Sequence, residues 1–505
     1  MAITGGASLN AVAATQKQAT ASNYIDFNQD MGWAQQYLPD LMEQEAEVFG
    51  PRTISGFLEQ IGAEEAMAAD QVIWSEQGRL HLSYKGKVSS ATAGADPGTG
   101  VSNIAQITIE DDIDGNVGAG FTAASHGIRV NDTIIVSNVN GVFKCLVTVV
   151  NAAVIDVAPY GQSALAALTT SKATTILVYG SEYGKGQSYV TAAGTTNTTD
   201  ARGANEPAFK TFSNKPVIMK DYYEVSGSDT SRIGWIETSS ESGSSGYLWY
   251  LKAESDTRAR FNDYVEMAML EGELALAASE VQGSTIIQGS TTNATLDAGT
   301  EGLFAAIESR GNITSGISGV NAATDLAEFD AILAEFDKQG AIEENMMFVN
   351  RATSLAMDDM LASMNSYGAG GTSYGVFDNS EDMALNLGFS GFRRGSYDFY
   401  KSDFRYLNDF ATRGGINAAN AAEAIRGVIV PAGTSTVYDQ QLGKNLKRPF
   451  LHVRYRASQT DNRKMKTWTT GSVGAATSAL DAMQIHMLTE RCLVTQGANN
   501  FMLMK

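Results

Sequence analysis

Residues 88–207 differ in composition from the chain on both sides of them. This segment consists largely of glycine, alanine, serine and threonine interrupted by short β-branched runs, and strand-like sequence flanks it at 71–87 and again at 208–228. The change indicates a β domain inserted between two strands that can pair with each other. Because an isolated two-stranded ribbon is only marginally stable in water, the predicted ribbon of 71–87 and 208–228 needs another molecule to lie on.

The centre of the inserted segment carries the clearest local signal in the chain. Asn140 and Gly141 stand between two apolar runs, and this pair favours a tight type I′ hairpin turn because both residues tolerate positive φ. A second turn is predicted at Asn151. Two further runs bring the total to about five strands, enough for a small open barrel. The predicted strands are 107–110, 133–137, 142–150, 154–157 and 175–179.

Opposite charges gather near the two ends of the chain. Residues 1–25 are small and polar and predict a mobile arm, whereas residues 26–70 predict an acidic helical segment with a break at Gly50-Pro51. A basic span lies at 444–466. It fits a solvated strand face, complementarity between subunits, which fixes register and partner choice, or contact with DNA. Against the single carboxylate Asp461, its cations are Lys444, Lys447, Arg448, Arg454, Arg456, Arg463, Lys464 and Lys466.

Residues 247–281 show the longest helical pattern. Ser244 or Ser245 can cap its start, and Gly283 follows its end. A helix of this length would run about 52 Å, longer than a small domain is wide, so we expect an elongated molecule. The apolar stripe of the helix consists of Phe261, Val265, Ala268 and Leu276.

An α/β region follows. A helix is predicted to begin at Thr324 or Asp325 and to stop at Gly340, with an apolar stripe at the spacing of one helix face. That stripe comprises Leu326, Phe329, Leu333 and Phe336. The next predicted elements are a strand at 346–349, a helix at 353–365 and a strand at 428–430.

Composition excludes several classes of protein. The net charge of -20 argues against affinity for nucleic acid or for an anionic membrane driven by overall charge. Two cysteines in 505 residues cannot form a disulfide framework, and they suit a reducing compartment. Residues 1–23 lack a cationic start followed by an apolar core, and no apolar run reaches the roughly 18 residues of a membrane span. Neither a secretion signal nor a membrane segment is expected.

The short motifs predict no catalytic, cofactor-binding or metal site. Residues 371–375, GTSYG, match a nucleophile elbow, but a glycine run replaces the strand that must precede it, so a loop tip is the better interpretation. Residues 118–123 match a dinucleotide phosphate turn without a helix after it. Residues 110–115 space oxygen atoms as in a calcium loop, although Phe121 stands where a glutamate is required. The four histidines are scattered, and we expect no enzymatic activity.

Two N-terminal stretches and the order of the predicted elements resemble a known family. The stretches are MAITGGASLNAVAATQKQ and NYIDFNQDMGWAQQYLPDLMEQEAEVFGPRTISGFLEQ, residues 1–18 and 23–60. With the paired strands, the long helix, the α/β region and the closing β segment, the chain resembles the major capsid protein of tailed bacteriophages, with the Hong Kong 97-type fold. It is most similar to that of crAss-like phages of gut bacteria. The resemblance covers essentially the whole chain.

The resemblance implies an α+β architecture with three characteristic parts: a peripheral domain with a long spine helix, an axial α/β domain and an extended β loop. A small β-barrel-like domain is inserted in that loop. The implied segments are an arm at 1–25, an acidic helical segment at 26–70, the extended loop at 71–87 and 208–228, the inserted domain at 88–207, the peripheral domain at 229–285 and 434–505 with its spine helix at 247–281, and the axial domain at 286–433.

The resemblance also implies a function. The chain would self-assemble through hexamers and pentamers into the icosahedral head shell that encloses packaged double-stranded DNA, being assembled in the bacterial host cytoplasm and ending in the virion. Implied partners are a scaffolding protein, a portal, capsid auxiliary or head-fibre proteins, and DNA touched on the inner face without sequence specificity; no cofactor and no membrane contact are implied. A tail or baseplate component is the nearer alternative, and a secreted carbohydrate-active enzyme or adhesin the more distant one. Candidate assembly contacts are Arg79, Lys85, Lys210, Lys215, Lys220, Lys444, Lys447 and Arg448.

Overall fold

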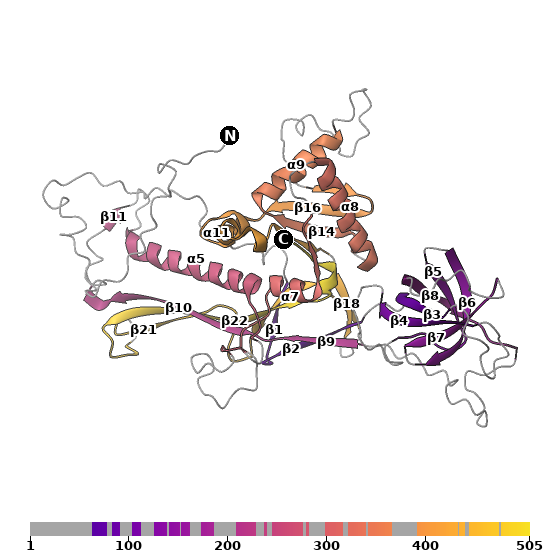
Figure 1. Cartoon of the computed structure of the whole chain (residues 1–505). Helices are drawn as coiled ribbons and strands as arrows, with labels where there is room; N and C mark the ends of the chain where they lie inside the picture. The colour runs from indigo at the N-terminus through magenta and orange to yellow at the C-terminus, as the bar shows by residue number, and fades with distance from the viewer. Residues whose placement is uncertain are drawn as a thin grey trace. The chain divides into compact units, whose positions relative to one another are not determined.

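The structure is a computed structural model of the chain, which divides into two units, residues 75–211 and residues 1–74 with 212–505 (Figure 1). Each unit is described by itself. The described residues are 63–77, 83–90, 104–112, 126–138, 141–151, 153–161, 173–185, 209–228, 237–239, 245–275, 279–281, 298–316, 322–339, 342–365, 391–432, 434–439, 444–473 and 476–505. The predicted arm at 1–25, most of the predicted acidic helical segment and the GTSYG and 118–123 motifs lie outside them.

The smaller unit contains a closed β-barrel. Its strands are antiparallel neighbours in the order β3-β4-β7-β6-β5-β8, and β8 closes the barrel on β3, where Ser83 is opposite Leu177. Alternate side chains of a strand point to opposite faces, so each β-branched run supplies one inward row. The strands are β3 (Ser83–Ser90), β4 (Ala105–Asp112), β5 (Asp132–Asn138), β6 (Gly141–Asn151), β7 (Val154–Pro159) and β8 (Ala173–Ser181).

The barrel core is apolar and shielded from water. Its inward rows include side chains that are 0% exposed, namely Ile107, Ile134, Val147, Ile155 and Ile176. The strands predicted from these runs are all present. Closure removes every free strand edge, so the barrel satisfies its own backbone hydrogen bonds without a neighbour.

The barrel differs from the predicted one in three respects. It has six strands and is closed, whereas an open barrel of about five is expected from the sequence. The sixth strand, β3, comes from the segment assigned to the ribbon, because Tyr84 and Val88 point into the core and are 4% and 1% exposed. In the central hairpin Asn138 pairs with Gly141, so Gly141 begins β6 and belongs to the strand.

A two-stranded ribbon joins β2 (Val72–Gln77) to β9 (Phe209–Asn214). These strands are the pair expected between 71–87 and 208–228. Each strand of the ribbon is shorter than predicted. The later part of 71–87 forms β3 of the barrel, and the later part of 208–228 forms β10 (Val217–Ser226), which belongs to a sheet of the larger unit.

The larger unit contains a six-stranded mixed sheet in the order β13-β23-β17-β14-β16-β15. Helices α8 (Ala322–Gln339) and α9 (Arg351–Asn365) pack on it through Phe329, Phe336 and Met357, which are 0% exposed. Both helices, and strands β14 and β17, match the predicted α/β elements. The strands are β13 (Asn312–Thr314), β14 (Glu344–Val349), β15 (Gly391–Arg394), β16 (Tyr397–Asp403), β17 (Gly427–Pro431) and β23 (Met502–Met504).

A five-stranded sheet forms the second half of the larger unit. Its main path is β1-β20-β22-β10, and β21 also pairs with β22. Helix α5 (Leu248–Glu271) runs along β10 and β22 (Figure 1), and its Phe261 and Val265 pack against Met219 and Met487. The remaining strands of this sheet are β1 (Ala63–Met67), β20 (Leu451–Arg456), β21 (Lys466–Gly471) and β22 (Ala482–Thr495).

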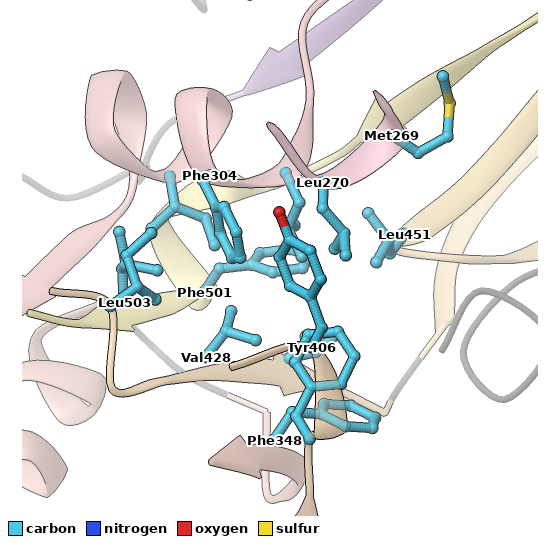
Figure 2. Close-up of a cluster of buried hydrophobic side chains, with 14 of the residues drawn as sticks. Met269, Leu270, Phe304, Phe348, Tyr406, Val428, Leu451, Phe501 and Leu503 are labelled. Carbon is cyan, nitrogen blue, oxygen red and sulfur yellow. The ribbon is translucent and has the colours of Figure 1, made fainter. Parts of the chain in front are cut away.

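One apolar cluster joins the two sheets of the larger unit. Figure 2 shows Leu270 from α5, Phe304 from α7 (Leu303–Arg310), Leu451 from β20 and Leu503 from β23 pointing toward one another. All four are at most 3% exposed. Because strands of both sheets and two helices contribute to it, this cluster fixes the sheets as one unit.

Helix α5 ends ten residues earlier than the predicted 247–281, at Glu271. Its 24 residues span about 36 Å. The reason is packing at Gly272, where a Cβ atom would lie 2.6 Å from the Ala268 carbonyl oxygen and 2.7 Å from that of Thr300. Beyond it the chain is extended, and Leu274 forms a bridge with Gly299. Sequence periodicity does not reveal such a close approach from a distant segment.

The remaining elements are short. Strands β11 (Glu237–Ser239) and β12 (Ser245–Tyr247) pair with each other, as do β18 (Thr434–Asp439) and β19 (Lys444–Pro449). The helices are α10 (Arg405–Asn408), α11 (Arg413–Ala419) and the 3-10 turns η3 (Ala421–Glu423) and η4 (Ala498–Asn500).

Candidate assembly surfaces

Strand β1 corrects the predicted helical segment 26–70, because residues 63–67 are a strand. It lies parallel to β20, with Glu65 opposite Arg454 and Met67 opposite Arg456. The sequence AEEAM has one large apolar side chain, Met67, which is 9% exposed. A pairing with residues almost 400 positions away decides the conformation, and local helical propensity does not.

Ion pairs connect β1 to the basic span. Glu65 lies 2.7 Å from the Arg454 guanidinium, and Glu64 pairs with Lys464 and, at 3.4 Å, with Arg491. Asp70, just beyond the strand, pairs with Arg456. The acidic and basic regions singled out in the sequence are therefore complementary, and for these residues the pairing occurs within one chain.

A second set of pairs holds the basic span itself. Glu490 of β22 lies 2.7 Å from Arg463 and 3.7 Å from Arg456, and Lys466 lies 2.8 Å from Asp461. The hydrogen bond from Lys466 lowers the pKa of Asp461. The cations 454–466 are thus largely paired inside the chain, which leaves fewer of them for DNA or for another subunit. Side chains such as Lys464, 45% exposed, still face solvent, as the solvated-face interpretation predicts.

Arg491, on β22, is a buried cation that depends on Glu64. The Arg491 side chain is 9% exposed, and its burial lowers its pKa, while the Glu64 carboxylate opposes that shift. Arg491 also donates to the Lys464 carbonyl oxygen at 2.7 Å. Removing Glu64 would therefore leave a poorly solvated cation without its carboxylate partner.

The predicted contact residues are divided between the two units. Lys85 on β3 and Lys210 on β9 belong to the smaller unit and are exposed. Lys215 and Lys220 belong to the larger unit, the first half-buried and the second exposed on β10. The backbones of Lys444, Lys447 and Arg448 lie in β19, which pairs with β18. Their side chains, and Arg79 as a whole, lie outside the described residues.

The root of the ribbon is fixed to the larger unit by an arginine and an asparagine. The Arg310 guanidinium lies 4.5 Å from the Phe212 ring centroid and 5.7 Å from that of Trp74, so it contacts one aromatic ring from each strand. Its Nη2 also donates to Glu301 at 2.8 Å. Cation–π contact of this kind fixes where both strands leave the larger unit.

Asn214 completes that root. Its side chain is 2% exposed; Nδ2 donates to the carbonyl oxygens of Leu493 at 2.7 Å and Glu301 at 2.9 Å. Its Oδ1 accepts from the Glu301 amide at 2.9 Å and from the Thr300 hydroxyl at 3.2 Å. A single buried amide therefore connects the end of β9, strand β22 and the segment before α7. Sequence reading missed this residue, since a lone asparagine carries no pattern.

An aromatic row lies on the five-stranded sheet. The His486 ring stacks between Tyr222, at 5.9 Å between centroids, and Trp468, at 5.2 Å. Its Nε2 lies 2.7 Å from the Thr470 hydroxyl. Tyr222 is 56% exposed and Trp468 37%. Residues 217–224 alternate between half-buried and exposed positions, which places Tyr222 on the exposed face. Their sequence, VIMKDYYE, shows no matching alternation of apolar and polar residues, so the sequence carries no signal of this row.

The histidines and the other metal-binding side chains of the described residues are scattered. No group of three or more metal-binding side chains occurs there. His126 in the barrel unit lies edge-on to Tyr84, and His452, 1% exposed, has Nδ1 3.2 Å from the Pro449 carbonyl oxygen. Of the helices among these residues, none combines the length and the apolar character that crossing a bilayer requires.

Comparison with known proteins returned no matching family model and no matching curated protein. Among solved structures, the one titled "Capsid structure of the Cyanophage P-SCSP1u" is 8% identical, covering 96% of this chain and 98% of that one, with a TM-score of 0.38. The structure titled "Microbacterium phage Oxtober96" is 8% identical over 95% of this chain and 99% of that one, with a TM-score of 0.37. The one titled "Asymmetric unit of bacteriophage PhiM1 mature capsid" is 10% identical over 64% and 79%, at 0.31. TM-scores of this size do not establish a shared fold.

Proposed function

We propose that this chain is a structural subunit of a bacteriophage head, the major capsid protein with a Hong Kong 97-type fold that the sequence resembles. The observation that carries the proposal is the order of its elements: a ribbon that detours through a barrel, then helix α5 along a sheet, then a six-stranded α/β sheet, then closing strands that return to both sheets. The resemblance implies that same order.

The β2–β9 ribbon supports an assembling protein over a lone globule. It is a two-stranded sheet, and such a sheet does not bury enough surface to be stable alone in water. Its root is nonetheless held to the larger unit by Arg310 and Asn214. A two-stranded element with a fixed root and little packing surface of its own fits a contact with another subunit.

In this proposal the chain closes into pentamers and hexamers, forms the shell around double-stranded DNA, and resides in the virion after assembly in the host cytoplasm. Its role is architectural, and it performs no catalysis. A separate scaffolding protein, a portal and auxiliary or head-fibre proteins would be its partners. The strongly negative chain, at -20, would limit adhesion to packaged DNA.

Negative-stain electron microscopy of the purified chain, produced with and without a candidate scaffolding protein, tests this proposal. Closed shells, or rings of five and six copies, are expected. A variant in which Asn214 and Arg310 are both replaced by alanine should give fewer particles from equally soluble protein. Monomers alone at high concentration, with the scaffolding protein present, would refute the proposal.

A further inference from the structure

Phe410 has the most exposed large apolar side chain among the described residues, at 83%. It lies between α10 and α11. An isolated exposed apolar residue needs no explanation, but a second large apolar side chain of the same segment is also exposed, that of Ile416 on α11, at 53%. A docking role for Phe410 requires that its segment has one fixed backbone conformation.

Hydrogen bonds fix the segment on which Phe410 lies. The Thr412 hydroxyl donates to the Tyr406 carbonyl oxygen at 2.6 Å and to that of Asp409 at 3.0 Å. The Asp409 side chain accepts from the Ala411 amide at 3.0 Å, and the Gly415 amide donates to the Thr412 carbonyl oxygen at 3.1 Å. These bonds hold the backbone on both sides of Phe410 in one conformation.

Two glycines hold the Phe410 backbone in place from below. A Cβ atom on Gly415 would lie 2.2 Å from the Phe410 carbonyl oxygen, and one on Gly414 would lie 2.6 Å from the Asp409 carbonyl oxygen. Only glycine therefore permits this approach. The backbone that carries the exposed ring is consequently held rigidly, and little backbone freedom remains to be lost when a partner binds it.

The support is itself anchored to the core. Arg413 Nη1 lies 2.9 Å from Glu271 at the end of α5, and Glu271 accepts from the buried Tyr406 hydroxyl at 2.7 Å. Asn417 donates to the Ile425 carbonyl oxygen at 2.8 Å and accepts from its amide at 3.1 Å. Two separate sets of contacts thus connect the segment to the rest of the larger unit.

The surface 409–423 carries little net charge. Its ionisable residues are Asp409, Arg413 and Glu423. Arg413 pairs with Glu271, Glu423 lies 3.3 Å from Lys505, and the Asp409 carboxylate is bonded to the Ala411 amide. In a chain of net charge -20, such a surface is one where a second, equally negative copy can approach with little repulsion.

We propose that residues 409–423 form a contact surface for a second copy of this chain, with Phe410 as its anchor. This inference rests on the proposed function and names a surface through which it acts. A few buried anchor residues carry most of the energy of an interface, and the low net charge of 409–423 favours a copy of this strongly negative chain over a basic partner. The occupant that we propose is therefore this protein itself.

Site-specific photo-crosslinking tests this inference directly. Phe410 is replaced by p-benzoyl-phenylalanine in the full chain, the concentrated protein is irradiated, and crosslinked peptides are identified by mass spectrometry using a mixture of isotopically light and heavy chains. Mixed light–heavy crosslinks from position 410 are expected. This readout does not require closed particles, so it is separable from the microscopy that tests the proposed function. Crosslinks within one chain only, to another protein only, or none at all would overturn the inference.

Substitution gives a second measure. Phe410→Asp should weaken self-association by about tenfold or more, because it replaces the apolar phenylalanine ring with a charged carboxylate. Phe410→Leu should retain association within about threefold, since it keeps an apolar anchor. Neither change should lower the melting temperature of the dissociated chain, because the side chain is 83% exposed. Equal self-association of Phe410→Asp and the wild type, measured by sedimentation velocity, would contradict the inference.

Discussion

The barrel and the five-stranded sheet hold their strands by different means. Each barrel strand contributes an inward row of buried apolar side chains, and closure leaves no strand at an edge. In the five-stranded sheet, β1 is an edge strand whose connection to β20 depends on backbone pairing, on Met67 and on the carboxylates Glu64 and Glu65. The comparison indicates that the barrel is stable by itself, whereas β1 is held by contacts that solvent and salt can weaken.

Two cysteines report on these regions separately. Cys145 in β6 and Cys492 in β22 are both 0% exposed, and burial raises the pKa of each thiol to about 12. At pH 8 both are therefore protonated and shielded, so a thiol reagent reaches each only when its own region opens. Labelling rates of the two cysteines in one sample compare the two regions directly.

The largest expected effect is a loss of stability confined to the barrel. Ile107→Ala should destabilise the barrel by about 3 kcal/mol, because a fully buried side chain is truncated and a cavity remains. Labelling of Cys145 should accelerate by about two orders of magnitude while that of Cys492 is unchanged. Leu177→Ala, at an outward position 41% exposed on the same barrel, is the matched control and should change little. Equal acceleration of both cysteines would show that the two regions unfold together.

A smaller effect is expected at the root of the ribbon. Asn214→Ala should cost about 2 kcal/mol, since it removes five hydrogen bonds and leaves buried groups, among them the Leu493 carbonyl, without this partner. Because Leu493 follows Cys492, labelling of Cys492 should accelerate by about 30-fold and that of Cys145 should not change. Gln459→Ala, at an exposed position of the same unit outside the proposed contact surface, serves as the control. Faster labelling of Cys145 instead would contradict the assignment of Asn214 to the larger unit.

The smallest effect concerns the charges on β1. Glu65→Gln should reduce stability by about 0.5 to 1 kcal/mol, as expected for a partly exposed ion pair with Arg454. In the wild type, an increase from 0.05 to about 1 M NaCl should raise hydrogen exchange in residues 63–67 and leave the barrel unaffected, because salt screens ion pairs but not apolar packing. Glu335→Gln, which removes the exposed pair with Lys338, is the control. Salt-insensitive exchange at β1 would refute the idea that charges hold this strand.

Elements defined by local pattern could be predicted from the sequence. The stripe Leu326, Phe329, Leu333 and Phe336 gave a helix whose inner face is buried, and the β-branched runs of the barrel gave its strands. In both cases the periodicity of apolar residues matches the geometry of a single element, so no knowledge of distant segments was required.

Features set by distant contacts could not be predicted. The residues near Ala63 show no strand pattern, because strand β1 forms only through its pairing with β20, which begins at Leu451. The end of α5 depends on a close approach of Gly272 to Thr300, and closure of the barrel depends on β3 pairing with β8. For the candidate surfaces, charge composition identified the two complementary regions, but only the fold shows that Glu65 and Arg454 pair with each other inside one chain. Phe410, Asn214 and Arg310 carry no sequence signal of their role.

The contact of Trp74 with Phe212, whose ring centroids are 6.3 Å apart, has a practical consequence. The polypeptide leaves the larger unit and re-enters it at neighbouring points, so residues 75–211 begin and end close together. A foreign domain whose termini are adjacent can therefore replace them without a change in the backbone of the larger unit. If the protein forms shells, every copy would then offer a regularly spaced attachment point for a displayed enzyme or antigen.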